Sequence, residues 1–160
     1  MDGSHKIPVS VLVVIHTPDL QVLLLERADH PGYWQSVTGS MHPGETLEQT
    51  ALREVFEETG LEAPEAMLTD WSVTTVYEIY PEWRHRYAPG VTQNTEHVFG
   101  LRIAEPRAPT LSPREHLHYR WLPWAEAAAA AFSPSNAAAI RMLPQRPTHR
   151  HDPHAARRHL

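Results

Sequence analysis

Cysteine is absent from the 160 residues of this chain. Disulfides, thiolate metal sites and cysteine nucleophiles are therefore excluded, and any metal has to be held by oxygen or imidazole ligands. No apolar run approaches the roughly 18 residues that a membrane-spanning helix requires. The first residues, MDGSHKIP, also lack the charged-then-apolar pattern of a signal peptide. We therefore expect a cytoplasmic protein without a membrane partner.

Positive charge is scarce over most of the chain and concentrated at its end. Four arginines and one aspartate give residues 144–160 a formal charge of +3, which leaves −8 for residues 1–143 out of a total of −5. An acidic domain is a poor binder of polyanions, so we expect no nucleic-acid partner. The final segment is short of large apolar groups, which predicts a disordered basic tail over 144–160 after one folded domain over 1–143.

Strand-like and helix-like segments alternate along the chain. Residues 9–17 and 21–27 are β-branched and aliphatic and flank a turn signal at Pro18–Asp19, which predicts a hairpin. Strand runs interrupted by helices, without internal repeats, favour a mixed α/β sandwich over a doubly wound parallel sheet. Further strands are expected at 35–39, 70–80, 95–103 and 118–124, and helices at 46–59, 125–132 and 135–143.

The helix expected over 46–59 has both a start and a stop signal. Thr46 and Gln49 have the spacing of a capping box, and Gly60 follows the last turn. On an ideal helix the apolar side chains form one stripe that can pack on a sheet, separate from an acidic face. The stripe comprises Ala51, Leu52, Val55 and Phe56, and the acidic face comprises Glu54, Glu57 and Glu58.

The acidic face brings like charges together at i, i+3 and i+4, where they repel one another. A hard divalent cation would remove this repulsion, because carboxylate oxygens are preferred ligands of Mg²⁺ and Mn²⁺. Arg53 lies one turn before Glu57 and is placed to hold that carboxylate in a forked contact. Considered without its context, the cluster is equally compatible with an ordinary solvated acidic face.

The wider context of this helix resembles a known pattern. Gly39, Glu45 and the run REVFEETGL over 53–61 fill every fixed position of the Nudix box. The resemblance to Nudix hydrolases implies an α/β/α sandwich that hydrolyses a nucleoside diphosphate linked to another group. It also implies Mg²⁺ or Mn²⁺ bound by the box glutamates, and a loop at Gly39 that lets the backbone approach phosphates. The catalytic candidates in the box are Arg53, Glu54, Glu57 and Glu58.

Hydrolysis of a pyrophosphate link also needs a base that takes a proton from the attacking water. A box glutamate, Glu96 in NTEHVF or Glu115 in PREHLHY could supply it. We favour Glu115, because a Pro-flanked loop readily presents functional groups.

Outside the box, the chain resembles the bacterial dihydroneopterin triphosphate pyrophosphatases of folate biosynthesis. This resemblance implies conversion of that triphosphate to its monophosphate and pyrophosphate, with metal ligands at Glu54, Glu58 and Glu115. The matching segments are PVSVLVVI (8–15), YWQSVTGS (33–40), RHRYAPGVTQNTE (84–96), EHLHYRWL (115–122) and AAAAAFSPSNAAAI (127–140). The substrate-binding positions implied by the resemblance are Lys6, Arg27, Thr38, Tyr77, Glu78, Ile79, Tyr80 and Ser133.

The residue types agree in part with such a substrate. Lys6 and Arg27, at the ends of adjacent predicted strands, suit a triphosphate as a point charge and a fork. Tyr77, Tyr80 and Trp34 offer aromatic faces for a flat pterin. Strand-edge charges and core aromatic residues are the structural alternatives for these two groups.

Two basic residues and two rival functions complete the expectations. The basic run Arg84-His85-Arg86 could bind phosphates or organise a subunit contact. We favour a structural role, in which Arg84 and Arg86 tie their loop to acidic neighbours. One rival is a house-cleaning hydrolase for (d)NTPs or oxidised nucleotides, and the other is a non-catalytic Nudix-fold binding module. The intact set of box carboxylates argues against the second rival. The sequence leaves the oligomeric state open.

Overall fold

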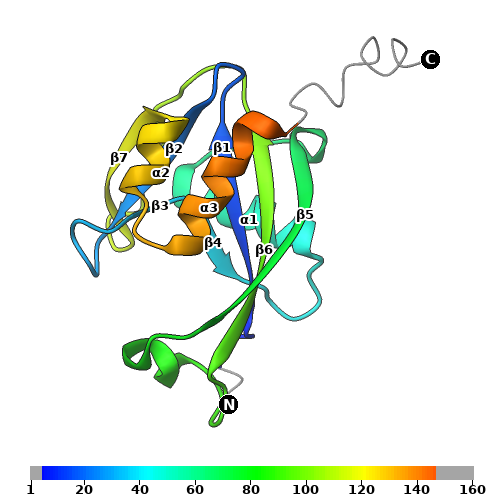
Figure 1. Ribbon diagram of the computed structural model, residues 1–160. Coiled ribbons are helices and arrows are strands. Elements are labelled where there is room, and N and C mark those ends of the chain that lie inside the picture. Colours follow the sequence, from blue (N-terminus) through cyan, green and yellow to red (C-terminus); the bar gives the residue numbers. More distant parts are fainter. Residues whose placement is uncertain (1–4, 147–160) are drawn as a thin grey trace.

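Seven strands and three α-helices succeed one another along residues 5–146, the part of the chain that the computed structural model describes (Figure 1). Three short 3-10 helices, η1 to η3, connect or follow them. The elements are β1 (Val9–His16), β2 (Gln21–Arg27), β3 (Trp34–Gln35), β4 (Val37–Ser40), α1 (Leu47–Thr59), η1 (Glu65–Met67), β5 (Leu68–Glu78), η2 (Pro81–Arg86), β6 (Gln93–Arg102), β7 (His116–Pro123), α2 (Trp124–Ala130), α3 (Pro134–Met142) and η3 (Leu143–Gln145).

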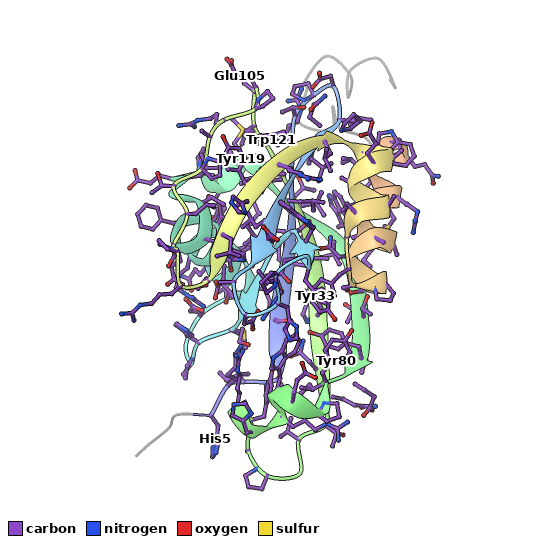
Figure 2. All side chains as sticks on the ribbon, turned by 90° about the vertical axis from the view of Figure 1, so that its left-hand side faces the viewer. His5, Tyr33, Tyr80, Glu105, Tyr119 and Trp121 are labelled. Carbon is purple, nitrogen blue, oxygen red and sulfur yellow. The ribbon has the colours of Figure 1, made fainter. Side chains whose placement is uncertain are left out.

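Helices cover both faces of one mixed sheet. The main strand order is β3-β2-β1-β6-β5, with β4 also pairing β1 and β7 also pairing β2. Figure 2 shows α1 on one side of the sheet and the pair α2 and α3 on the other. This arrangement confirms the predicted α/β/α sandwich with a mixed sheet.

The central strand β1 has different partners along its two edges. On one edge it runs parallel to β6 over its whole length. On the other edge, residues Ser10–Val13 pair with β4, and the antiparallel pairing with β2 is recorded only at His16 and Val22. The predicted hairpin is therefore present, but its two strands soon separate. β2 pairs with β7 from Gln21 to Arg27, and with β3 at Leu25 and Glu26.

Both faces of β1 are buried, which explains its nearly continuous apolar sequence. Val11 and Val13 belong to the core beneath α1, together with Val55. Leu12 and Val14 belong to the core beneath α2 and α3. Each such side chain contributes about 1.5–3 kcal/mol when it leaves water. The strand therefore anchors both helical layers.

The ends of α1 are those that its sequence predicts. Thr46 accepts a hydrogen bond from the Gln49 backbone N–H, and the Gln49 side chain accepts one from the Thr46 backbone N–H. Gly60 adopts a left-handed conformation with φ of 77° and closes the helix through a bond to Phe56 O. A residue with a side chain would be strained at this φ.

The predicted apolar stripe of α1 is confirmed for Ala51, Leu52 and Val55, which pack in the core, but its separation from the acidic face was wrong. Phe56 is 50% exposed, whereas Glu54 and Glu58 are buried beside Val55 against the sheet. The buried face of the helix thus carries two carboxylates, and one large apolar side chain is left in solvent. Hydrophobic sorting does not explain this arrangement, but a functional use of the two acids does.

Most strands differ by one or two residues from their predicted bounds, and two of them are interrupted. The strand expected at 35–39 is divided at Ser36, whose N–H donates to Asn136 Oδ1 at 2.8 Å rather than to a neighbouring strand. β5 contains a bulge between Asp70 and Val73. β7 begins at His116, two residues earlier than expected, so the preceding residue 115 stands at the strand entrance.

The chain continues in ordered contact beyond the predicted domain end. η3 includes Pro144, and the Arg146 guanidinium lies 4.8 Å from the centroid of the Trp71 ring. The predicted division of the chain at residue 144 stays a prediction, and residues 147–160 lie outside the described part of the chain. Among the helices of residues 5–146, none is long and apolar enough to cross a membrane.

Candidate active site

A cavity of about 900 Å³ brings together segments from most of the chain. Its wall includes the segment before β1, the ends of β2, β4, β5 and β6, the helix η2, the entrance of β7 and the first turn of α3. Ten of the predicted site residues line it, whereas Trp34, Arg53, Glu54 and Glu57 do not. The ten are Lys6, Arg27, Thr38, Glu58, Tyr77, Glu78, Ile79, Tyr80, Glu115 and Ser133.

Glu54 and Glu58 form a buried carboxyl pair at the inner face of α1. The two side chains are close enough to influence each other's pKa, and Glu58 is 2% exposed. Burial raises the pKa of both carboxyls, that of Glu58 well above its usual range, and the contact between the two acids raises the Glu58 pKa further. Burial therefore favours the protonated form of these carboxyls, and a neighbouring cation would favour the ionised form.

Gly39 has a different use from the one expected. It lies within β4, and an added Cβ would overlap the carboxyl group of Glu54. A glycine is needed here because the Glu54 carboxyl occupies the space that a side chain would fill. Gly39 thus lets α1 approach the sheet. The approach of its backbone to phosphates stays a prediction.

Arg53 organises the other carboxylates around α1. Its guanidinium makes a fork to Glu45, with Nε and one terminal nitrogen at 2.6 and 3.0 Å from the two oxygens. It also donates to Glu54 Oε2 at 2.9 Å and to the Ser40 carbonyl at 2.9 Å. The expected fork to Glu57 was wrong, because that carboxylate is reached by a single nitrogen at 3.3 Å or more. The hydrogen bond to Arg53 holds the pKa of Glu45 at about 2, so Glu45 remains ionised and keeps the guanidinium in place.

Glu57 is the most exposed of the three glutamates, at 48% of its side chain. It pairs with Arg53 on the outer side of the helix instead of lining the cavity. Of three acids within five residues of the sequence, Glu54 and Glu58 are thus buried and Glu57 is in solvent.

Four cations line the cavity: Lys6, Arg27, Arg86 and Arg114. The first three and the acids Glu58 and Glu115 form a group that we call the α1 side. Lys6, the only lysine of the chain, is held by a backbone bond from its N–H to Arg86 O at 2.8 Å. Burial lowers the pKa of Lys6, and the charges of Arg86 and Arg27 lower it further. Mutual repulsion among these cations suits a polyanionic ligand.

Arg27 and Arg86 differ in how firmly they are held. Arg27 makes a fork to Asp29 at 2.8 and 2.7 Å, and its guanidinium lies 4.7 Å from the Trp83 ring centroid. These contacts fix the direction of the fork at the end of β2. The expected ties between η2 and acidic neighbours are present for Arg84, which contacts Glu78, whereas Arg86 lines the cavity.

Glu115 stands at the entrance of β7, where the fold brings it to the α1 side. Its carbonyl accepts from the Ala28 N–H and its own N–H donates to Ser112 O, both at 2.9 Å. The side chain is exposed and lines the cavity, and its charge contributes to the raised pKa of Glu58. Two backbone bonds therefore position a carboxylate that remains accessible to a ligand.

His116 is a cavity residue that the sequence reasoning missed. It is 4% exposed, its Nε2 lies 3.8 Å from Glu58 Oε1, and burial lowers its pKa to about 4. A neutral imidazole beside Glu58 adds no charge to the pair. The only sequence signal was its position next to Glu115.

The opposite side of the cavity, beneath α3, is polar but carries no cation, and we call it the β6 side. It consists of Ser10, Tyr77, Asn94, Glu96 and Ser135. Burial and the charge of Glu96 raise the pKa of Tyr77 to about 12, so its hydroxyl remains protonated. Ser133 caps α3 by accepting from the Asn136 N–H at 3.3 Å. Its hydroxyl also lies 3.0 Å from that of Ser135.

Aromatic side chains surround the cavity between these two sides. Tyr80 and Trp83 are adjacent, with ring centroids 5.2 Å apart, and Tyr33 stacks on Phe132 at 4.4 Å. Tyr33 and Tyr80 are labelled in the same lower region of Figure 2, away from Trp121. Trp83 and Phe132 line the cavity but were not among the predicted residues. Their aromatic character was the only available signal.

Trp34, Thr38 and Ile79 have roles within the protein itself. Trp34 packs on the core beneath α2 and α3, with the Arg120 guanidinium 4.8 Å from its ring centroid. The Thr38 hydroxyl donates to Val11 O, which leaves its oxygen available as an acceptor. The Ile79 N–H donates to the Thr92 carbonyl, and the Ile79 carbonyl accepts from Arg84.

The carboxyl pair fits a divalent cation. Within residues 5–146, no three acidic or imidazole side chains are already grouped as a metal cage. Glu58 Oε1 is nevertheless buried without a hydrogen-bond partner, and the adjoining Glu54 supplies further oxygens. Such oxygens are hard ligands of the type that Mg²⁺ and Mn²⁺ prefer. Glu115 is the further carboxylate on this side of the cavity.

Comparisons with known proteins agree with this geometry. Residues 6–143 match the NUDIX domain family. The chain is 48% identical over 145 residues to the dihydroneopterin triphosphate diphosphatase of Escherichia coli K12, covering 89% of this chain and 95% of that protein. It is 42% identical over 141 residues to the Haemophilus influenzae protein of the same name, covering 86% and 88%. The solved E. coli dihydroneopterin triphosphate pyrophosphohydrolase has a TM-score of 0.80 at 47% identity, covering 86% and 95%.

Proposed function

Because this chain belongs to the NUDIX family, we propose that it hydrolyses dihydroneopterin triphosphate to dihydroneopterin monophosphate and pyrophosphate. The observation that carries this proposal is the cavity with two unlike sides. One side combines three cations with buried carboxyls, and the other is polar and uncharged apart from Glu96. A triphosphate joined to a flat, hydrogen-bonding ring is complementary to this cavity, because its charged part suits the cationic side and its neutral ring suits the polar side.

The α1 side is suited to the phosphates. Lys6, Arg27 and Arg86 bind non-bridging oxygens, with Lys6 acting as a point charge and the arginines as forks. The rings of Tyr80 and Trp83, with that of Tyr77 on the β6 side, contact the faces of the flat heterocycle. Thr38, Glu78, Ile79 and Ser133 border the same space and complete the proposed substrate contacts.

Nudix hydrolases generally use divalent metals, and we propose Mg²⁺, with Mn²⁺ as a possible substitute. When bound, such an ion neutralises phosphate charge and lowers the pKa of water. Glu54, Glu58 and Glu115 are the proposed ligands, and Arg53 orients Glu54. Glu57 stays a predicted ligand, although its carboxylate would have to exchange its contact with Arg53 for the ion.

The chemical step needs no covalent intermediate. The oxygen of a water molecule bonds to one phosphorus, the bridging P–O bond breaks, and pyrophosphate leaves with the electron pair. We propose that the Glu115 carboxylate accepts the proton of the attacking water, because it is accessible and held by two backbone bonds. Lys6 and Arg27 hold the charge that develops on the departing oxygens.

Product analysis tests the proposal directly. After incubation of the protein with dihydroneopterin triphosphate and Mg²⁺, pyrophosphate and the monophosphate should appear in equal amounts. Glu58→Gln, assayed in parallel, controls for contaminating phosphatases. Orthophosphate as the primary product would contradict the proposal, because it would mean that the terminal phosphate is removed.

The first rival function is also a hydrolysis of triphosphates, so activity alone does not separate the two. The deciding quantity is the ratio of kcat/KM for dihydroneopterin triphosphate to that for dATP or 8-oxo-dGTP. A ratio below one would favour the house-cleaning function. The binding-module alternative is disfavoured by the complete carboxyl set and the available Glu58 oxygen. A cytoplasmic location stays a prediction.

A further inference from the structure

We propose that Glu96, together with Asn94, recognises the 2-amino-4-oxo edge of the substrate's pterin ring and is a specificity-determining residue. The inference rests on the proposed function, because it assigns the ring to the β6 side of the cavity. Neither residue belongs to the Nudix box or to the substrate positions implied by the family resemblance.

Glu96 is a buried acid that faces the cavity with an unused oxygen. It is 4% exposed and lines the cavity from β6. Ser135, on the first turn of α3, donates to its Oε1 at 3.0 Å. Its other oxygen, Oε2, has no protein partner among residues 5–146. A buried carboxyl with spare acceptor capacity calls for hydrogen-bond donors from a ligand.

Asn94 supplies a second unused acceptor on the same side. It is 1% exposed, and its Nδ2 donates to Ser10 Oγ at 2.7 Å and to the Tyr77 hydroxyl at 3.1 Å. Its Oδ1 is left buried with no partner in the described part of the chain. A buried acceptor of this kind costs about 1–3 kcal/mol unless a ligand satisfies it.

The strand places both acceptors together. Residues 94 and 96 are two positions apart on β6, so their side chains leave the same face, about 6–7 Å apart along the strand. The edge of a neutral pterin carries a ring N–H beside an exocyclic amino group, which together offer three N–H donors. A carboxylate accepts two parallel N–H bonds, and the nearby amide oxygen suits the remaining one. Guanine is the nucleobase that presents the same edge.

Other roles for Glu96 fit the structure less well. Its pKa is raised by burial and lowered by Ser135, and neither a cation nor another carboxyl alters it appreciably. Lys6 and Glu58, by contrast, both have pKa values that respond to the charges of Glu54 and Glu115 on the α1 side. Glu96 therefore belongs to a separate electrostatic environment. It is thus poorly placed to bind phosphate, to share the metal or to serve as the general base.

The test compares two substrates in one variant. Glu96→Gln should lower kcat/KM for dihydroneopterin triphosphate at least about tenfold, because the amide replaces one acceptor by a donor that faces a donor. For dATP, whose adenine edge pairs one donor with one acceptor, the change should stay within about threefold or be an increase. Burial raises the pKa of Glu96, so assays at alkaline pH favour the ionised form of the wild-type carboxyl. Glu126→Gln, at an exposed position of α2 outside the cavity, is the matched control and should leave both values unchanged.

Binding of neopterin, which has the same ring edge but no phosphates, gives a readout independent of turnover. In metal-free protein, fluorescence titration should show an affinity for neopterin at least about tenfold weaker for Glu96→Gln than for wild type. If this variant fails to fold, Ser135→Ala carries the test, because it removes the hydroxyl that orients the carboxyl. Its neopterin affinity should then fall at least about threefold while dATP turnover persists.

The outcomes separate this inference from the proposed function. A wild-type enzyme without preference for dihydroneopterin triphosphate over dATP would overturn the function. A wild-type preference that survives in Glu96→Gln, or a parallel loss of both activities in a folded variant, would overturn only the role of Glu96. Unchanged neopterin affinity in folded variants would do the same.

Discussion

Buried carboxyls occur on both sides of the cavity, and burial raises the pKa at each of them. On the α1 side, Glu54 and Glu58 contact each other and lie within reach of Arg53 and Glu115. On the β6 side, Glu96 has one neutral partner, Ser135. The carboxyls of the two regions are therefore similar in burial but differ in the residues that surround them. Crowded acids favour a cation, whereas a single acid with a spare oxygen favours N–H donors.

The largest expected effect is at the crowded side. Glu58→Gln should lower kcat at least about 10³-fold, because a neutral amide is a weak ligand for a hard cation whose charge neutralisation is worth several kcal/mol. Steady-state kinetics at saturating Mg²⁺, with circular dichroism as a check of the fold, would measure this. Wild-type turnover in the variant would remove the metal-binding role.

Glu57→Gln is the informative partner of that variant. The box pattern predicts a comparable loss, although the structure places this carboxylate outside the cavity beside Arg53. A comparable loss would mean that Glu57 leaves Arg53 when the ion binds. A small loss would restrict the ligands to Glu54, Glu58 and Glu115.

The next effect separates chemistry from recognition. Glu115→Gln should lower kcat by at least about 10²-fold, the low end for a lost general base, with little change in KM. Glu96→Gln should instead act mainly through KM for the pterin substrate. If Glu96→Gln abolished turnover of every substrate while Glu115→Gln stayed near wild type, the assignments of the two sides would be reversed.

A smaller effect is expected at the residue that organises α1. Arg53→Lys cannot reproduce the fork to Glu45 together with the bond to Glu54, so kcat should fall about tenfold and the free energy of unfolding by about 1–2 kcal/mol. Denaturant unfolding and kinetics on the same sample would show both changes. Arg141→Lys is the control, because Arg141 is an exposed residue of α3 that does not line the cavity. Equal effects of the two substitutions would contradict a special role for Arg53.

The smallest effect is a pH dependence of metal-free stability. The raised pKa of Glu58 means that the folded protein binds its proton more tightly than the unfolded chain. Stability should therefore fall as pH rises above the ordinary glutamate value and through the folded pKa. In chelator at about pH 8, Glu58→Gln should melt above wild type, by about 2–4 °C for each kcal/mol, and the difference should vanish near pH 4.

Metal addition sharpens the same measurement. Mg²⁺ should raise the melting temperature of wild type and of Glu96→Gln alike, because both keep the α1 side intact, and it should raise that of Glu58→Gln much less. Glu96→Gln should also gain stability at alkaline pH in chelator, since the pKa of Glu96 is raised. If Glu96→Gln reduced the stabilisation by Mg²⁺, Glu96 would take part in metal binding, and the division of the cavity into two sides would be contradicted.

Local signals in the sequence were sufficient for the framework. The capping box at Thr46 and Gln49, the stop at Gly60 and the hairpin turn act within a few residues, so each could be predicted without knowledge of the fold. The box spacing then identified the family and its catalytic helix. Least predictable were the strand bounds, because Ser36 leaves its sheet for Asn136, a residue 100 positions away.

The sequence by itself determined that this is a mixed α/β sandwich with a capped, acid-rich helix, because those properties follow from periodicity and from neighbours along the chain. Only the tertiary structure decided which acids are buried. Glu57 and Glu58 are adjacent in sequence, yet the turn of the helix places one in solvent and the other beneath β4. The partnership of Glu96 with Ser135 joins β6 to α3 across 39 positions. Burial and long-range contact depend on how elements pack, and no local pattern specifies that.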